Sequence, residues 1–288
     1  MTTAIDPWLG RVLSGRYRLL QKASDGARGV LYRAERTEDG RRVAVKLLVP
    51  VVHQAREAFE KRFRNEVETA RALSDRNTLQ VFEGGHADEH TMFIASEWLS
   101  GIDLARMLVA RGPLNTRQAL FLANQVARSL ASAHEKKLFH GDLSPEGLFV
   151  TRDSRGLSLV KVMDYGRVRI ASFNDEGFSQ VDMPMGWARY LAPEQITSEE
   201  LDARSDIYAL GTILYRALSG ELPFRDATGI GILMSQVHDR APPLRSHPAA
   251  KEVPANVEEL VMRCLEKSPS DRFASADELV DLTERLAR

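Results

Sequence analysis

The sequence contains a single cysteine, Cys264, and a lone thiol cannot form a disulfide within the chain. Because Cys264 stands among helix-forming residues, it is predicted to be a small buried hydrophobe. Since the chain can form no internal disulfide, a reducing, cytoplasmic compartment is expected. The sequence also lacks an apolar run of the roughly 18 to 20 residues that a membrane helix needs, and its first residues lack a signal-peptide pattern. We therefore expect no membrane segment within this chain.

An excess of charge of either sign is missing too. The 39 Lys and Arg residues nearly balance the 40 Asp and Glu residues, so the net charge is -1 and the isoelectric point is near 6.7. A field strong enough to capture nucleic acid or an anionic membrane is not expected. The 43% of apolar and 27% of charged residues are typical of a soluble globular protein, and 288 residues suffice for one or two domains.

The first third of the chain is predicted to be a small sheet with one helix. Five segments are rich in β-forming residues: 17–23, 29–36, 41–49, 78–85 and 91–99. Between the third and the fourth, apolar residues recur with helical spacing at Phe59, Phe63, Val67, Ala70 and Leu73. Glu66 falls on the same stripe. A buried carboxylate needs a partner there, and Lys46 is the expected one.

From about residue 101 the pattern becomes helical. Apolar residues between Leu120 and His134 line one face of a helix, and residues 205–220 predict a helix buried on nearly all sides. Two short β-rich segments, 147–151 and 157–166, interrupt this pattern, and two amphipathic helices close the chain. The order predicts an α+β protein with a small β-rich part, a larger helical part and a cleft between them.

Several motifs carry groups suited to phosphate chemistry, and each has an ordinary alternative. Gly26 and Gly29 stand between two β-segments, where backbone N–H groups either approach a phosphate closely or form a simple hairpin turn. Lys46 is a phosphate ligand or a solvated lysine. His140, two residues before Asp142, is a packed core histidine or a catalytic base.

Taken in order, these motifs resemble the bacterial Ser/Thr protein kinases of the eukaryotic-like type, from about Tyr17 to the C-terminus. The stretches "VAVK", "HGD" and "DYG" match the phosphate-lysine strand, His-Arg-Asp and Asp-Phe-Gly of that family. "APEQ", "RSDIYALG" and "DRF" follow in family order. The resemblance implies a two-lobed protein-kinase-like fold with a nucleotide cleft. Residues 1–16 would be an N-terminal extension, 17–97 the N-lobe and 98–288 the C-lobe.

The resemblance also implies roles for single residues. Lys46 would hold the α- and β-phosphates of ATP and pair with Glu66. Asp142 would accept the proton of a substrate hydroxyl, and Asp164 would bind Mg²⁺ or Mn²⁺. The nucleotide site would further include Ser24, Gly26 and Gly29 in the phosphate loop, Leu31, Ala44 and Phe149 around the base, Ser96 behind it, and Glu97 and Leu99 in the hinge. Two structural contacts are implied as well: a Glu194–Arg272 ion pair, and a brace from Asp206 to the backbone of the catalytic loop.

The catalytic loop departs from the family at two positions that serve phosphoryl transfer. Gly147 replaces the asparagine that binds a second metal ion, and Ser144 replaces the lysine that meets the γ-phosphate. If each loss cost about 3 kcal/mol, the rate penalty would be about 10⁴-fold, although effects of neighbouring groups do not simply add. Glu146 is a nearby alternative metal ligand.

Three further positions also differ: Trp187 replaces a threonine, Ser24 replaces the first glycine of the phosphate loop, and Gly141 replaces the arginine that reads a phosphorylated activation segment. Apart from tyrosines, the hydroxyl residues between Asp164 and Glu194 are Ser172 and Ser179. Switching by phosphorylation of this segment is therefore not expected.

Two functions stay open at this point. One is a pseudokinase, a regulatory or binding module that holds ATP with a single metal ion and transfers phosphate poorly or not at all. The alternative is an active Ser/Thr protein kinase that transfers the ATP γ-phosphate to protein hydroxyls. A small-molecule kinase of related fold is disfavoured by "APEQ" and Arg272. Either main function implies a protein substrate or a regulated protein partner, and no nucleic acid.

Overall fold

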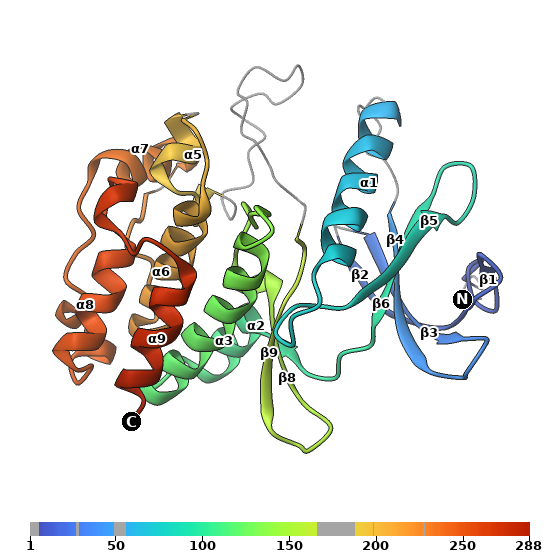
Figure 1. Ribbon diagram of the computed structural model, residues 1–288, viewed down its shortest axis with the longest axis horizontal. Coiled ribbons are helices and arrows are strands. Elements are labelled where there is room, and N and C mark those ends of the chain that lie inside the picture. The colour runs from blue at the N-terminus through green and yellow to red at the C-terminus, as the bar shows by residue number, and fades with distance from the viewer. Residues whose placement is uncertain (1–5, 27–28, 49–55, 166–187, 198, 227) are drawn as a thin grey trace, which may run out of the picture. The chain divides into compact units, whose positions relative to one another are not determined.

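The computed structural model describes residues 6–26, 29–48, 56–165, 188–197, 199–226 and 228–288. They form two compact units (Figure 1). The first unit runs to Ser74 and includes Leu79–Ser100, and the second comprises Asp75–Thr78 and Gly101–Arg288. The first unit is built on a β-sheet and the second mainly on helices, which confirms the predicted α+β class.

An antiparallel sheet of six strands forms the first unit, in the order β1-β2-β3-β4-β6-β5. Its strands are β1 (Val12–Leu13), β2 (Tyr17–Gly26), β3 (Gly29–Arg36), β4 (Arg42–Leu48), β5 (Val81–His86) and β6 (Met92–Glu97). Helix α1 (Arg56–Ala72) follows β4 in the chain. It confirms the helix that the apolar stripe predicted.

Two features of this sheet differ from the sequence pattern. The sequence predicted a turn from Ser24, but β2 continues to Gly26, because its pairing with β3 goes on to the Gly26–Gly29 pair. Strand β1 comes from the segment that was expected to be an extension, and it pairs with the start of β2 at the sheet edge. The sheet therefore begins before Tyr17.

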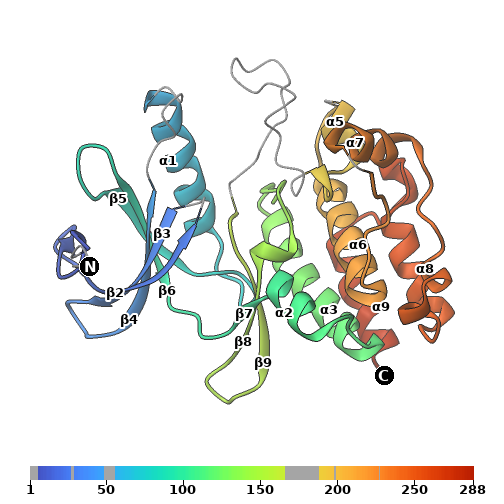
Figure 2. The same ribbon diagram turned by 180° about the vertical axis from the view of Figure 1, so that it is seen from behind.

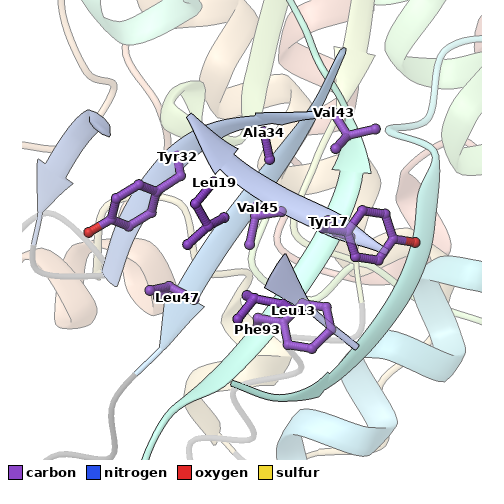
Figure 3. Packing of buried hydrophobic residues seen from close by; sticks show 10 residues of the cluster. Leu13, Tyr17, Leu19, Tyr32, Ala34, Val43, Val45, Leu47 and Phe93 are labelled. Carbon is purple, nitrogen blue, oxygen red and sulfur yellow. The ribbon is translucent and has the colours of Figure 1, made fainter. Parts of the chain in front are cut away.

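The two faces of the sheet are covered differently. On one side, which we call the core face, Tyr32 of β3 and Phe93 of β6 belong to the hydrophobic cluster in Figure 3. Trp8, which precedes β1, packs against this cluster. On the other side, the helix face, helix α1 lies beside the sheet (Figure 2), and its Phe63 packs against Met92 of β6. Since consecutive strand residues point to opposite faces, Met92 and Phe93 place α1 and the cluster on opposite sides.

The second unit combines a small sheet with helices. The sheet has the order β7-β8-β9, with β7 (Ile102–Asp103), β8 (Leu148–Arg152) and β9 (Ser158–Val162). The helices are α2 (Leu104–Arg111), α3 (Thr116–His134), α5 (Pro193–Thr197), α6 (Ala203–Ser219), α7 (Gly229–His238), α8 (Ala255–Cys264) and α9 (Ala276–Leu286). Within the described ranges, every helix falls short of the length and apolarity needed to cross a bilayer.

Helix α6 is buried on nearly every side, as the sequence predicted. Asp202 caps its start by accepting from the Arg204 N–H at 2.7 Å, and Gly220 ends it with a φ of 81°. A Cβ added at Gly211 would lie 2.5 Å from Cys264 Cβ, so the helix needs glycine to pack this closely on α8. Cys264 is buried, as predicted. Its burial raises the pKa of the thiol to about 12.

Candidate functional site

The predicted phosphate loop lies at the tip of the β2–β3 hairpin. Ser24 of β2 pairs with Leu31 of β3, and Gly26 pairs with Gly29. Gly29 has a φ of 107°, and a Cβ there would lie 2.1 Å from the Leu47 carbonyl oxygen. Only glycine fits this position, because its left-handed backbone and the neighbouring strand both exclude a side chain. Residues 27–28 lie outside the described ranges.

The sheet register gathers predicted nucleotide contacts in two rows on the helix face. One row runs across β2, β3 and β4: Ser24, Leu31 and Lys46. The next row runs across β3, β4 and β6: Arg33, Ala44 and Ser96. The rows share a face because they are two residues apart along each strand. The sequence did not single out Arg33, whose buried Nε has no hydrogen-bond partner among the described residues.

Lys46 and Glu66 come from the strand and the helix that meet on this face. Lys46 is half-buried in β4, and Glu66 is half-buried in α1 between Phe63 and Ala70, which are buried. Both elements are where the sequence predicted them. The direct pairing of the two side chains stays a prediction.

The predicted hinge begins at Glu97, the last residue of β6. The backbone N–H of Glu97 donates to the Gln80 carbonyl oxygen at 2.9 Å, and its Oε1 accepts from the Gln80 N–H at 2.9 Å. Leu99 is half-buried two residues further on. Phe149, expected beside the base, belongs to the second unit, where it is half-buried in β8 opposite Asp103. Its role beside the base stays a prediction.

The backbone of the catalytic loop is held by a buried carboxylate from α6. Asp206 Oδ2 accepts from the His140 N–H, and Oδ1 accepts from the Gly141 N–H, both at 2.8 Å. Oδ2 also lies 2.8 Å from Nε2 of His134. These contacts confirm the predicted brace from Asp206.

The charge of Asp206 is stabilised by its surroundings. Burial alone would raise the pKa of this carboxyl group, but the hydrogen bond to His134 and the hydrogen bond from the Gly141 N–H help to hold the pKa below its usual range. An ionised carboxylate is the form that can accept from all these donors. The loop backbone is therefore fixed by a charged, fully desolvated acceptor.

His140 is a packed histidine with both ring nitrogens engaged. Its Nδ1 accepts from the Asp142 N–H at 3.3 Å, so the proton is on Nε2, which donates to the Met163 carbonyl oxygen at 2.8 Å. The ring also lies 4.7 Å from that of Tyr165. His140 thus links the backbone of Asp142 to the residue before Asp164, and of its two predicted roles the structure favours the packed one.

Asp142 and Asp164 both belong to the second unit, Asp142 before the turn Pro145–Gly147 and Asp164 two residues after β9. Both residues are half-buried. Asp164 has a φ of 63°, a left-handed conformation that aspartate tolerates better than most residues and that is concentrated at functional sites. Gln195 adds a support that the sequence did not single out: its Nε2 donates to the Gly141 carbonyl oxygen at 2.8 Å. Its place beside Glu194 in "APEQ" was the available signal.

The second half of the catalytic loop is a short 3₁₀ turn, Pro145–Gly147, preceded by Ser144. The Gly147 N–H donates to the Ser144 carbonyl oxygen at 3.0 Å, and the Gly147 carbonyl oxygen accepts from the Met163 N–H at 2.8 Å. A Cβ at Gly147 would meet only the Met163 carbonyl oxygen, at 3.8 Å. A Cβ therefore fits at this position without a close contact. Glu146, the alternative metal ligand, is exposed.

A buried ion pair anchors helix α5 to the segment before α9, as predicted. Arg272 donates from Nη1 and Nη2 to the two carboxylate oxygens of Glu194 at 2.7 and 2.8 Å. It also donates to the carbonyl oxygens of Glu266, Lys267 and Arg204. The pair is thus satisfied on both sides, as a buried charge must be. Trp187, Ser172 and Ser179 lie outside the described residues.

The protein kinase domain family matches residues 17–282, and the chain belongs to this family. Its curated relatives include bacterial Ser/Thr protein kinases. Serine/threonine-protein kinase pkn3 of Myxococcus xanthus is 33% identical over 279 residues, which cover 96% of this chain and 51% of that protein. PknA of Mycobacterium tuberculosis is 33% identical over 282 residues, which cover 96% and 62%. The chain thus spans about half to three-fifths of these two relatives.

Solved structures confirm the fold. The PknI kinase domain of M. tuberculosis matches with a TM-score of 0.74 and 25% identity, covering 96% of this chain and 98% of that one. A single-site mutant of that domain matches with a TM-score of 0.74 over the full length of both chains, at 24% identity. The β-rich first unit and helical second unit are therefore those of a protein kinase fold.

Proposed function

We propose that the chain is an ATP-binding protein kinase domain in which phosphotransfer is weakened or lost, and that it serves as a regulatory or binding module. The observation that carries this proposal is the space at Gly147, where the nearest atom to an added Cβ is 3.8 Å away. The backbone does not demand glycine there. The absent asparagine oxygen is therefore a loss of metal-binding chemistry that the fold did not require.

The residues present suit ATP with one divalent ion. The Asp164 carboxylate is a hard oxygen ligand of the kind that Mg²⁺ prefers, and the Lys46 ammonium group suits a phosphate. Bound ATP supplies the transferable γ-phosphoryl group. In this proposal Leu31 and Ala44 contact the base and Lys46 holds the phosphates.

An active Ser/Thr protein kinase is the second candidate, and one observation favours it. The Asp142 N–H donates to the ring of His140. The neighbouring Gly141 donates its N–H to Asp206 and accepts from Gln195 at its carbonyl oxygen. This much support for a general base is expected where its position matters to chemistry. A protein partner accompanies either candidate, as substrate or as regulated protein.

The first experiment measures ATP binding by calorimetry with and without Mg²⁺. We expect binding that depends on one divalent ion, and we expect Asp164→Ala to weaken it about tenfold or more. Asp153→Ala is the matched control, because Asp153 is a carboxylate of the same unit in the β8–β9 turn. Binding that needs two ions, or that survives Asp164→Ala unchanged, contradicts the single-metal site.

The second experiment measures phosphate transfer by intact-mass spectrometry, with a generic basic protein as acceptor. We expect little transfer by the wild type and a gain of about 10²-fold in Gly147→Asn, since one well-placed ligand or donor is worth that much. Adding Asp142→Asn to Gly147→Asn is expected to abolish the gain. Gly229→Asn, at another glycine with open space, controls for the substitution itself. Efficient transfer by the wild type decides for the active kinase.

A further inference from the structure

Residues 6–16, which we call the strap, are attached to the sheet of the first unit and contribute one buried side chain, Leu13, to its core. The Gly10 N–H donates to the Leu19 carbonyl oxygen at 2.8 Å, and the Leu19 N–H donates to the Arg11 carbonyl oxygen at 2.9 Å. Leu13 of the strap is buried in the core-face cluster together with Leu19 (Figure 3). The Leu13 side chain therefore lies on the face of the sheet opposite the predicted nucleotide contacts.

The carboxylate of Asp6, near the start of the strap, forms a hydrogen bond with a side chain of strand β3. Oδ2 of Asp6 accepts from the hydroxyl of Tyr32 at 2.8 Å, and Oδ1 accepts from the Trp8 N–H at 2.9 Å. Tyr32 is 2% exposed, and its ring belongs to the core-face cluster. Burial, with help from Asp6, raises the pKa of Tyr32 above its usual range, so the hydroxyl stays a donor.

The other end of the strap is tied to β5. The Arg16 guanidinium donates to Glu83 Oε2 at 2.9 Å, and the Tyr17 hydroxyl donates to the same oxygen at 3.3 Å. Tyr17 pairs with Arg36, at the end of the β2–β3 hairpin that is far from its tip. The two tyrosines thus make similar bonds from the same cluster, but only Tyr32 stands near the hairpin tip.

The position of Tyr32 connects the strap to the phosphate loop. Tyr32 follows Leu31 in β3 and lies three residues after Gly29, so a shift of its backbone moves both. Its side chain points into the cluster, while Leu31 points to the helix face. One strand therefore carries the strap's anchor on one side and the predicted nucleotide contact on the other.

We infer that Asp6 is a positioning residue: through the Tyr32 hydroxyl it holds the start of β3, and thereby keeps Gly29 and Leu31 in place for the nucleotide contacts predicted for them. The inference deepens the proposed function and rests on it for the identity of the ligand. A hairpin that is already ordered loses less conformational freedom when it binds. Without the Asp6–Tyr32 hydrogen bond, the free-energy cost of ordering this part of β3 is added to the binding step.

The first test needs no nucleotide. Hydrogen exchange is measured on the full chain for the amides of residues 29–33, relative to the amide of Phe93 in the middle of the sheet. Tyr32→Phe is expected to speed exchange of the hairpin amides about fivefold over that reference, because local opening becomes easier. Tyr17→Phe, which removes the matching hydroxyl at the other end of the strap, is expected to leave the ratio unchanged. Equal ratios in both variants overturn the inference.

The second test separates positioning from simple loss of stability. Calorimetry compares ATP with adenosine, which lacks phosphates. Tyr32→Phe and Asp6→Ala are expected to weaken ATP binding about fivefold while adenosine affinity stays within about twofold. Asp6→Asn, which keeps an acceptor for the Tyr32 hydroxyl, is expected to restore most of the ATP affinity. An equal loss for both ligands overturns the inference.

The two tests also separate this inference from the proposed function. A wild-type chain that binds neither ATP nor adenosine contradicts the proposed function, and the exchange ratio then decides the role of Asp6 in ordering the hairpin. A wild type that binds ATP, with no change in Tyr32→Phe, contradicts the positioning role alone.

Discussion

The loop from Phe139 to Val150 has two halves that differ in how they are held. In the first half, the backbone around Asp142 is fixed by Asp206, Gln195 and the ring of His140. In the second half, the Ser144 side chain makes no capping hydrogen bond to the described 3₁₀ turn. The hydrogen bonds given above for Gly147 are all between backbone groups. One half is braced by buried charge and the other is a plain turn.

This difference separates the needs of the fold from those of phosphoryl transfer. The buried acceptors of the first half would be costly to lose, since donors facing them would be left unpaired in a dry interior. Among the described residues, nothing comparable opposes change in the second half. A chain of this family can therefore keep its loop in shape while it loses metal and phosphate ligands.

The sharpest way to break the braced half is to remove the anchor of α5, the helix that carries Gln195. Arg272→Ala leaves the buried Glu194 carboxylate without its partner, and we expect the free energy of unfolding to fall by about 3–5 kcal/mol. Arg204→Ala breaks the partly exposed pair with Asp202 instead and is expected to cost less than about 1 kcal/mol. Urea denaturation measures both. Similar losses in the two variants would falsify the view that burial sets the cost.

A smaller effect is expected from Asp206→Asn, which keeps the shape of the brace but not its charge. We expect a loss of about 2 kcal/mol at neutral pH, because charge-assisted hydrogen bonds become neutral ones. The pKa of Asp206 in the folded state is lowered. Its contribution to stability is therefore present above the unfolded value of about 3.9 and is lost as pH falls through the lower folded value.

The measurement is the free energy of unfolding as a function of pH below about pH 4. In this range Asp206 is protonated in the unfolded chain while it stays ionised in the folded protein. The wild type is expected to lose stability more steeply there than Asp206→Asn, so that the two curves converge in acid. Parallel curves would mean that another carboxylate carries the acid sensitivity.

The smallest effect belongs to the open half of the loop. Ser144→Ala and Glu146→Ala are expected to change the free energy of unfolding by less than about 0.5 kcal/mol, because neither side chain is buried among groups that depend on it. Thermal unfolding of both variants beside the wild type measures this. A loss as large as that of Asp206→Asn in either variant would remove the distinction between the two halves.

Much of this arrangement could be predicted from sequence order and periodicity. The stripe from Phe59 to Leu73 placed α1, and the apolar run after Ser205 predicted α6 and its burial. The brace from Asp206 came from the family resemblance rather than from spacing. The periodicity that predicts a helix lies within one continuous segment, and the motif that predicts the brace recurs within the family. Both can therefore be read from a single sequence.

Other features depend on contacts between segments that are far apart in the chain. The strap was expected to be an extension, because the two-residue strand β1 is too short for a periodic pattern and acquires its meaning only by pairing with β2. Likewise, "SDG" has the composition of a turn, yet it is held in β2 by its pairing with β3. Arg33 looked like an ordinary strand residue until the register placed it beside Ala44.

The contact between Gly211 and Cys264 has a practical consequence. The chain carries a single thiol, and that thiol is sealed between two closely packed helices with its pKa raised to about 12. A thiolate is the form that reacts with alkylating reagents, so labelling of the native protein must wait until the helices separate. The rate at which Cys264 of the unmodified chain reacts with a thiol reagent therefore measures how often the interior of the second unit opens to water.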